Sequence, residues 1–165
     1  MADRTITERL QPALLDRLTD QAPDSRTEAR DTRVIDLNRL RDIIRRDLSW
    51  LLNTNNLDTQ IDADRFPNAA NSVLNYGVRE VAGDFSTEER AQRIHKSIQT
   101  AIERFEPRIR EGTVEVVERK AEEGRRTTIV FDIAAEMWAQ PYPIELYLRS
   151  EVDTTTGELR LEEGS

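Results

Sequence analysis

Residues 101–116, AIERFEPRIREGTVEV, contain the point where a helical pattern gives way to strand patterns, and this change decides the fold. Before it, apolar residues recur at the spacing of one helix face, and they are Ile94, Ile98, Ala101, Ile102 and Phe105. After it, apolar residues recur at every second position, and they are Val114, Val116, Ile129, Phe131 and Ile133. Pro107 disfavours a helical conformation of Glu106, so the helix is predicted to end near Phe105.

The tripeptide Glu106-Pro107-Arg108 places two opposite charges around a rigid residue. In an extended chain, the side chains of Glu106 and Arg108 project to the same side. These residues alone leave two interpretations open. The corner is either a helix stop with two solvated charges or a preformed polar clamp that binds a partner.

Composition narrows the class of protein. The chain has 165 residues, which suits one domain with a short appendage. The formal net charge of −8 argues against a nucleic-acid partner, because nucleic-acid-binding proteins carry basic patches. The absence of cysteine excludes disulfides, thiolate catalysis and cysteine-ligated zinc. No apolar run approaches the roughly 20 residues of a membrane helix, and no apolar signal region follows the first residues, so we expect a cytoplasmic protein without direct membrane insertion.

Residues 1–35 are predicted to be an N-terminal docking segment and linker. Leu10, Leu14 and Leu18 lie on one face of a short helix, and residues 21–33 are polar without periodicity. A short helix is marginally stable alone in water. It therefore either folds back on the domain or docks on a partner through the three leucines.

Residues 36–165 are predicted to form one domain that begins with helices. Asp36 can cap the first helix, whose apolar stripe consists of Leu37, Leu40, Ile44, Leu48 and Leu51. A short helix over residues 70–76 is expected to end at Gly77, which would act as a C-cap glycine. A capping box at residues 86–89 begins the long helix that ends at the tripeptide.

Four strands are predicted after the helices. Three cover residues 108–119, 127–137 and 144–149, and a short last strand with Leu159 and Leu161 follows a turn at residues 156–157. This order predicts an α+β fold, in which N-terminal helices pack on a four-stranded antiparallel meander sheet. The last strand is short and flanked by charge, so we expect it at a sheet edge, where a strand of another chain can be added.

No catalytic, metal-binding or cofactor-binding residues are expected. The single histidine, His95, flanks the apolar stripe of the long helix, so a structural or surface role is expected for it. The sequence contains no Gly-rich phosphate loop and no nucleophile elbow. A glycoside hydrolase would require Glu106 to pair with Glu136 or Asp132, and nothing in the sequence selects such a pair.

Several segments, in their order and spacing, carry a family resemblance. They are residues 10–18, 46–54 and 72–77, the tripeptide 106–108, the connection from Trp138 to Pro143, and the final hairpin. Together they resemble TssE, the family of small baseplate subunits of bacterial type VI secretion systems. That family is similar to the small wedge protein of contractile-tail phage baseplates, a group long labelled lysozyme-like. One departure is Val-Arg-Glu at residues 78–80, where a more apolar, proline-containing continuation is expected.

The resemblance implies a structural protein at the inner, cytoplasmic face of the cell envelope. Its partners would be the wedge subunits TssF and TssG, with TssK as a further candidate, and the sheath subunits TssB and TssC. Glu106 and Arg108 would bind the wedge, with Pro107 as their rigid support. The sheet would be similar to the strand-exchange domain of the sheath protein, and the first sheath ring would start on it. A phage-type tail subunit is the alternative, and a lysozyme-like hydrolase is a further one.

Overall fold

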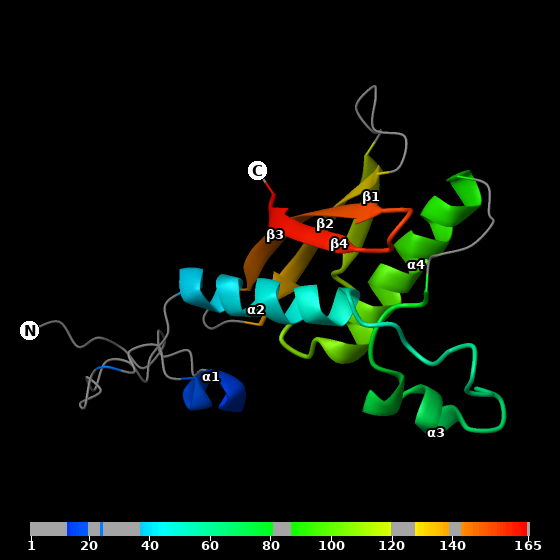
Figure 1. Ribbon diagram of the computed structural model, residues 1–165. Coiled ribbons are helices and arrows are strands. Elements are labelled where there is room, and N and C mark those ends of the chain that lie inside the picture. Colours follow the sequence, from blue (N-terminus) through cyan, green and yellow to red (C-terminus); the bar gives the residue numbers. More distant parts are fainter. Residues whose placement is uncertain are drawn as a thin grey trace, which may run out of the picture.

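The computed structural model describes residues 13–19, 24, 37–80, 87–119, 128–138 and 143–164. Helices come first and strands follow, as the sequence predicts (Figure 1). The helices are α1 (Leu14–Leu18), α2 (Leu37–Leu52), α3 (Pro67–Ala70), the 3-10 helix η3 (Val73–Asn75) and α4 (Thr87–Phe105). The strands are β1 (Glu115–Arg119), β2 (Thr128–Met137), β3 (Ile144–Asp153) and β4 (Leu159–Glu163).

The four strands form one antiparallel sheet in the order β1-β2-β3-β4, so the predicted α+β fold with a meander is confirmed. In the centre of the sheet, Asp132 of β2 lies opposite Arg149 of β3. Strand β4 lies at an edge, as expected from its length and its charged flanks. The turn before β4 contains Gly157 at a φ of 76°, a conformation that glycine adopts without strain.

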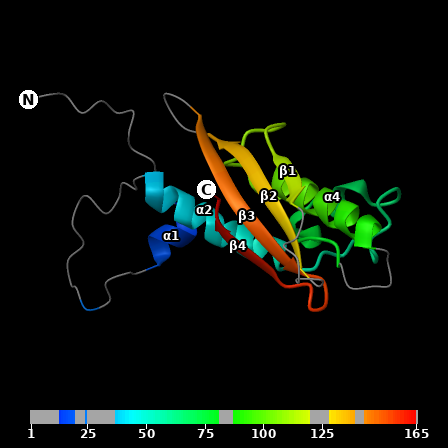
Figure 2. The same ribbon diagram turned by 90° about the horizontal axis from the view of Figure 1, so that it is seen from above.

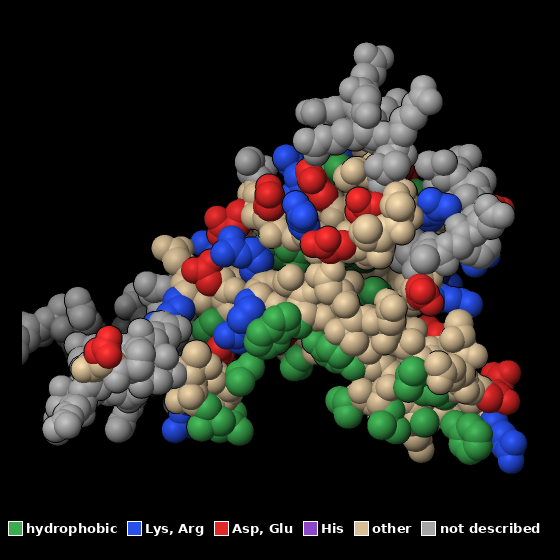
Figure 3. All heavy atoms as spheres, viewed as in Figure 1, with side chains coloured by type: hydrophobic (Ala, Val, Ile, Leu, Met, Phe, Trp, Pro, Cys, Tyr) green, Lys and Arg blue, Asp and Glu red, His purple; other side chains and the backbone are tan. Residues whose placement is uncertain are grey.

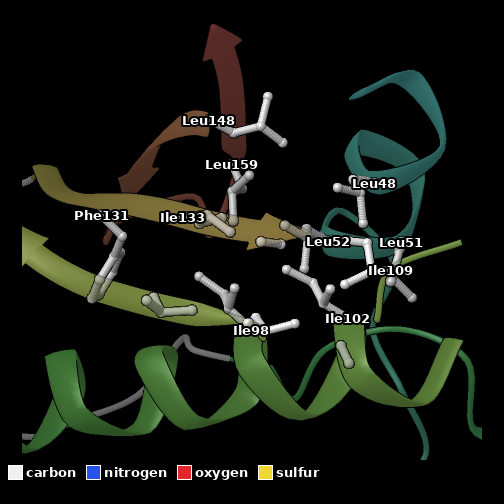
Figure 4. Close-up of a cluster of buried hydrophobic side chains, with 14 of the residues drawn as sticks. Leu48, Leu51, Leu52, Ile98, Ile102, Ile109, Phe131, Ile133, Leu148 and Leu159 are labelled. Atoms are coloured by element: carbon white, nitrogen blue, oxygen red, sulfur yellow. The ribbon is translucent and has the colours of Figure 1, made fainter. Parts of the chain in front are cut away.

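Helices α2 and α4 cover one face of the sheet and contact each other, with α2 on the β4 side and α4 on the β1 side (Figures 1 and 2). Side chains alternate along β2, and every second one is buried against the helices. Figure 4 shows the core where the two layers meet, with Ile98 and Ile102 of α4 facing Ile133 of β2. The period of two in the strands and the helical period in α4 therefore mark one shared core.

Strand β1 is shorter than the predicted strand over residues 108–119 and begins at Glu115. The earlier residues meet β2 only through an isolated bridge between Ile109 and Met137. A turn then intervenes, in which Thr113 N donates to Arg110 O and Gly112 takes a φ of 74°. Val114 thus keeps the apolar alternation with Val116 although it precedes the strand, and Ile109 is buried separately at the isolated bridge.

The predicted helix over residues 70–76 is also wrong in detail. Helix α3 ends at Ala70, and η3 forms separately after it. Gly77 has a φ of 120°, and a Cβ placed on it would lie 2.1 Å from the carbonyl oxygen of Thr54. Gly77 is therefore required by a close approach of two backbones rather than as a helix cap. Around it, Val78 N donates to Thr54 O at 2.8 Å and Asn56 N donates to Val78 O at 2.9 Å.

Most of the predicted stripe of α2 is buried, but Leu37 is 43% exposed. His95 has the expected structural role, since its Nε2 lies 2.7 Å from the carbonyl oxygen of Val116.

Some predictions lie outside the described residues. They concern Leu10, the cap residues Asp36 and Ser86, and the predicted linker except Asp24. Within the described ranges, no helix has both the length and the apolar character needed to cross a membrane.

Candidate functional site

The Glu106-Pro107-Arg108 tripeptide forms a tight turn directly after α4. Glu106 N still donates to Ile102 O at 3.0 Å, and Ile109 N donates to Glu106 O at 3.1 Å. The segment is therefore a turn, and the extended conformation considered for the two charged side chains does not occur. The helix nevertheless ends at Phe105, as predicted, because the residue before a proline disfavours helical geometry.

The turn still brings the two charged side chains together. Arg108 Nε donates to Glu106 Oε1 at 2.6 Å, and Arg108 Nη2 donates to Glu106 Oε2 at 2.5 Å. The backbone N–H of Arg108 donates to the same Oε1 at 3.1 Å. This is a bidentate arginine–carboxylate pair, the arrangement that combines charge attraction with fixed geometry.

The pair is withdrawn from solvent. Glu106 is 5% exposed, whereas 29% of the Arg108 side chain is exposed. Burial opposes the charge of Arg108, but the hydrogen bonds and charges of Glu106, together with those of Asp47, outweigh it and raise the pKa of Arg108 above its ordinary value. The interpretation of the corner as two solvated charges is therefore wrong, and the corner presents a rigid guanidinium with a buried counter-ion.

Five alternating charges connect this corner to α1, and we call them the charge chain. Arg108 Nη2 donates to Asp47 Oδ2 at 2.7 Å. Arg46 Nε and Nη2 donate to Asp47 Oδ1 at 2.9 and 2.6 Å. Arg46 Nη2 also lies 2.9 Å from Oδ1 of Asp16, which is buried. The order Asp16, Arg46, Asp47, Arg108, Glu106 thus crosses from α1 through α2 to the corner.

The charge chain borders an open concavity of about 480 Å³, which we call the corner hollow. Its lining is mostly apolar and consists of Ala13, Leu15, Asp47, Trp50, Leu51, Tyr76, Phe105, Glu106, Pro107 and Arg108. Figure 3 shows hydrophobic side chains gathered along this underside of the molecule, around a hollow between α1 and the α3 region. An apolar concavity with a few fixed polar groups is the usual form of a binding site.

Aromatic side chains form one wall of the corner hollow. The rings of Tyr76 and Phe105 meet edge to face, with centroids 5.3 Å apart. The guanidinium of Arg46 lies 4.9 Å from the ring centroid of Trp50, within cation–π range. Burial, and then the charges of Asp47 and Glu106, raise the pKa of Tyr76 above its ordinary value.

The structure brings Glu106, Pro107 and Arg108 into one site, but it places the predicted leucines elsewhere. Leu14 and Leu18 are 70% and 74% exposed on α1, and Leu15 rather than either of them lines the corner hollow. The ion pair from Asp16 places α1 against α2, so this segment folds back on the domain. Its two leucines remain exposed in that position, so the predicted docking on a partner stays a prediction.

Several residues of the site were missed from the sequence. Arg46, Asp47 and Trp50 entered the sequence analysis only as part of the family segment at residues 46–54. One signal was available, because Asp47, Trp50 and Leu51 stand at i, i+3 and i+4 and must share a helix face. No periodic signal connects that face to Arg108, which lies 61 residues beyond Asp47.

The carboxylates of the hydrolase alternative bind different arginines. Glu136 Oε2 accepts from Arg110 Nη1 at 2.5 Å, and Asp132 binds both Arg119 and Arg149 on the sheet. Glu106 is bound by Arg108 at the corner. The structure therefore does not bring Glu106 together with Glu136 or Asp132 as two carboxylates without counter-ions. Within the described part of the chain, no group of three metal-ligating side chains comes together.

Residues 38–142, more than half of the chain, match the family model described as baseplate wedge protein gp25. The chain belongs to the baseplate wedge protein gp25 family. This is the family of TssE, so the resemblance seen in the sequence is confirmed at the level of the family. The comparisons with curated proteins and with solved structures gave no match.

Membership in the gp25 family supports a role as a component of a phage-type baseplate. The matched range runs from α2 to the end of β2 and contains the tripeptide, Asp47 and Trp50. Helix α1 and strands β3 and β4 lie outside it.

Proposed function

We propose that this gp25-family protein is a structural subunit of a type VI secretion baseplate. It joins wedge subunits through the corner hollow and provides the platform on which the sheath assembles. The observation that carries the proposal is the charge chain, which fixes the Arg108 guanidinium beside an apolar, solvent-open concavity. The wedge partners of this hollow are TssF and TssG, with TssK as a further candidate.

The corner hollow suits a protein partner for two physical reasons. Arg108 is held by Glu106 and Asp47 before any partner arrives, so binding costs little further side-chain entropy. Trp50, 52% exposed, offers a large apolar surface next to it. Tryptophan and arginine are the residue types that most often dominate the energy of protein interfaces.

The edges of the sheet supply the second half of the proposal. β1 and β4 are the outer strands of the described sheet, and each of them is only five residues long. Strands β2 and β3 have ten residues each, so they continue beyond their outer neighbours. We propose that strands of the sheath subunits TssB and TssC pair with one of these edges by β-strand addition.

The proposal includes a non-enzymatic role. It is supported by the arginine ion pairs of Glu106, Glu136 and Asp132, which join the three carboxylates to different arginines instead of to one shared site. Clearing of purified cell wall by the protein tests this point. Sustained clearing that is lost in Glu106→Gln would revive the hydrolase alternative, provided that the variant remains folded by circular dichroism.

Co-expression with the large wedge subunits encoded in the same gene cluster tests the main proposal. The wild-type protein is expected to co-purify with a tagged TssF–TssG complex and to remain bound through size-exclusion chromatography. Failure of the folded wild-type protein to associate would contradict the proposal. Neighbouring genes for a phage tail instead of a secretion system would assign the same structural role to a phage-type particle.

A further inference from the structure

Few contacts among the described residues hold helix α1 on the domain. It has five residues, too few for a helix that is stable by itself. Its two most exposed leucines, Leu14 and Leu18, are 70% and 74% exposed and do not line the apolar surface beside them. Among the described residues, the ion pair of α1 is that between Asp16 and Arg46, and Asp16 Oδ2 has no hydrogen-bond partner.

The same helix forms one wall of the corner hollow. Ala13 and Leu15 line it opposite Phe105 and Pro107, so a segment that enters the hollow meets α1. Arg46 does not depend on α1 for its own stability. Its two hydrogen bonds to Asp47 and its position over the Trp50 ring involve no residue of α1. Release of α1 therefore leaves no unpaired guanidinium and returns the Asp16 carboxylate to water.

We propose that α1 is a latch on the corner hollow. In the free protein the Asp16–Arg46 pair holds the latch closed, and docking of a wedge partner at Arg108 displaces it. Leu14 and Leu18 then pack on that partner. The proposal rests on the docking role of the corner and adds a regulatory step to it.

The latch has a measurable thermodynamic consequence. If a partner binds only the open form, its apparent affinity is its affinity for that form multiplied by the fraction of molecules that are open. Breaking the Asp16–Arg46 pair raises that fraction, so Asp16→Ala is expected to bind the TssF–TssG complex about three- to tenfold more tightly than the wild type. Leu14→Ser with Leu18→Ser removes the new contacts instead and is expected to bind about tenfold more weakly.

The motion can be measured directly, because the chain contains no cysteine that would take up a label. Spin labels at Arg17→Cys on α1 and at Thr100→Cys on α4 occupy exposed positions and report the distance between latch and domain. In the free protein we expect a narrow distance distribution that broadens in Asp16→Ala. The matched control is Asp42→Ala, which removes the exposed Arg45–Asp42 pair elsewhere on α2 and is expected to leave the distribution unchanged.

Addition of the TssF–TssG complex is expected to shift the label distance in the wild-type protein. An unchanged distribution in the bound state, or in free Asp16→Ala, would overturn the latch, as would weaker or equal binding by Asp16→Ala. Absence of binding by every variant would contradict the docking role instead. The comparison of free wild type with free Asp16→Ala would still decide whether Asp16 holds α1.

Discussion

Arg108 Nη2 lies 2.7 Å from Asp47 Oδ2, a contact that joins the end of α4 to the middle of α2 across 61 residues of chain. The same nitrogen binds the buried Glu106 carboxylate. The tripeptide is therefore part of the tertiary structure as well as a surface feature. Substitutions within it should affect the stability of the fold, which the sequence alone did not indicate.

Arg108→Ala is expected to reduce the free energy of unfolding by about 1–3 kcal/mol, because Glu106 would remain buried without its guanidinium. Urea unfolding followed by circular dichroism measures this. Arg160→Ala is the matched control, since it removes an exposed arginine whose contact with Glu158 is 3.5 Å long, and it should change the stability by less than about 0.5 kcal/mol. Equal stability of both variants would show that the corner is only a surface feature.

Asn75→Ala is expected to cost about 2–3 kcal/mol of stability. The Asn75 side chain is buried, accepts a hydrogen bond from Leu57 N at 2.9 Å, and donates to Asp58 Oδ1 and Ala70 O. Its loss leaves the loop before α3 without its main internal support. Thermal unfolding compared with that of Asn71→Ala, an exposed asparagine with one bond to Pro67 O, checks the prediction. A similar melting temperature for the two variants would contradict it.

Gly77→Ala is expected to be more harmful than Gly112→Ala, although both glycines have a positive φ. At Gly77 the added Cβ would overlap the Thr54 carbonyl, whereas nothing lies within 4 Å of a Cβ at Gly112. We expect a loss of about 1 kcal/mol at Gly112 from backbone strain alone and at least about 3 kcal/mol at Gly77. Chemical denaturation of both variants measures the difference, and equal losses would refute the close approach.

Ionisation of Tyr76 should lower the free energy of unfolding in alkaline solution. Its pKa is raised in the folded protein, mainly by burial, so the folded state keeps the proton longer than the unfolded state does. This contribution is complete below about pH 10, the pKa of an unfolded tyrosine, and is lost as pH rises through the folded value. Tyr76→Phe should flatten the decline of the melting temperature above pH 10. Tyr147→Phe should keep most of the decline, because the pKa of Tyr147 is raised mainly by a hydrogen bond to Glu145 that is exposed to solvent, which weakens its effect. An identical decline in wild type and Tyr76→Phe would contradict this assignment.

Periodic burial made much of the fold predictable. The end of α4 at Phe105 and the inward residues of β2 follow from side chains that repeat with the period of their element. The start of β1 was mispredicted because Val114 is buried and keeps the period of two with Val116, although the strand begins only at Glu115. The charge chain was unpredictable for a different reason. Its links from Asp16 to Arg46 and from Asp47 to Arg108 form only through tertiary structure, and long-range ion pairs leave no local pattern in a chain that is one-third charged.

The affinity of purified variants for an immobilised TssF–TssG complex tests the docking role of the corner hollow most directly. Trp50→Ala removes an exposed ring from the hollow, and Tyr147→Ala removes an equally exposed ring, also 52%, from the far face of the sheet. We predict that Trp50→Ala weakens binding at least about 30-fold, or about 2 kcal/mol, while Tyr147→Ala stays within about threefold of the wild type. Binding of a folded Trp50→Ala variant with wild-type affinity would contradict docking at the corner hollow.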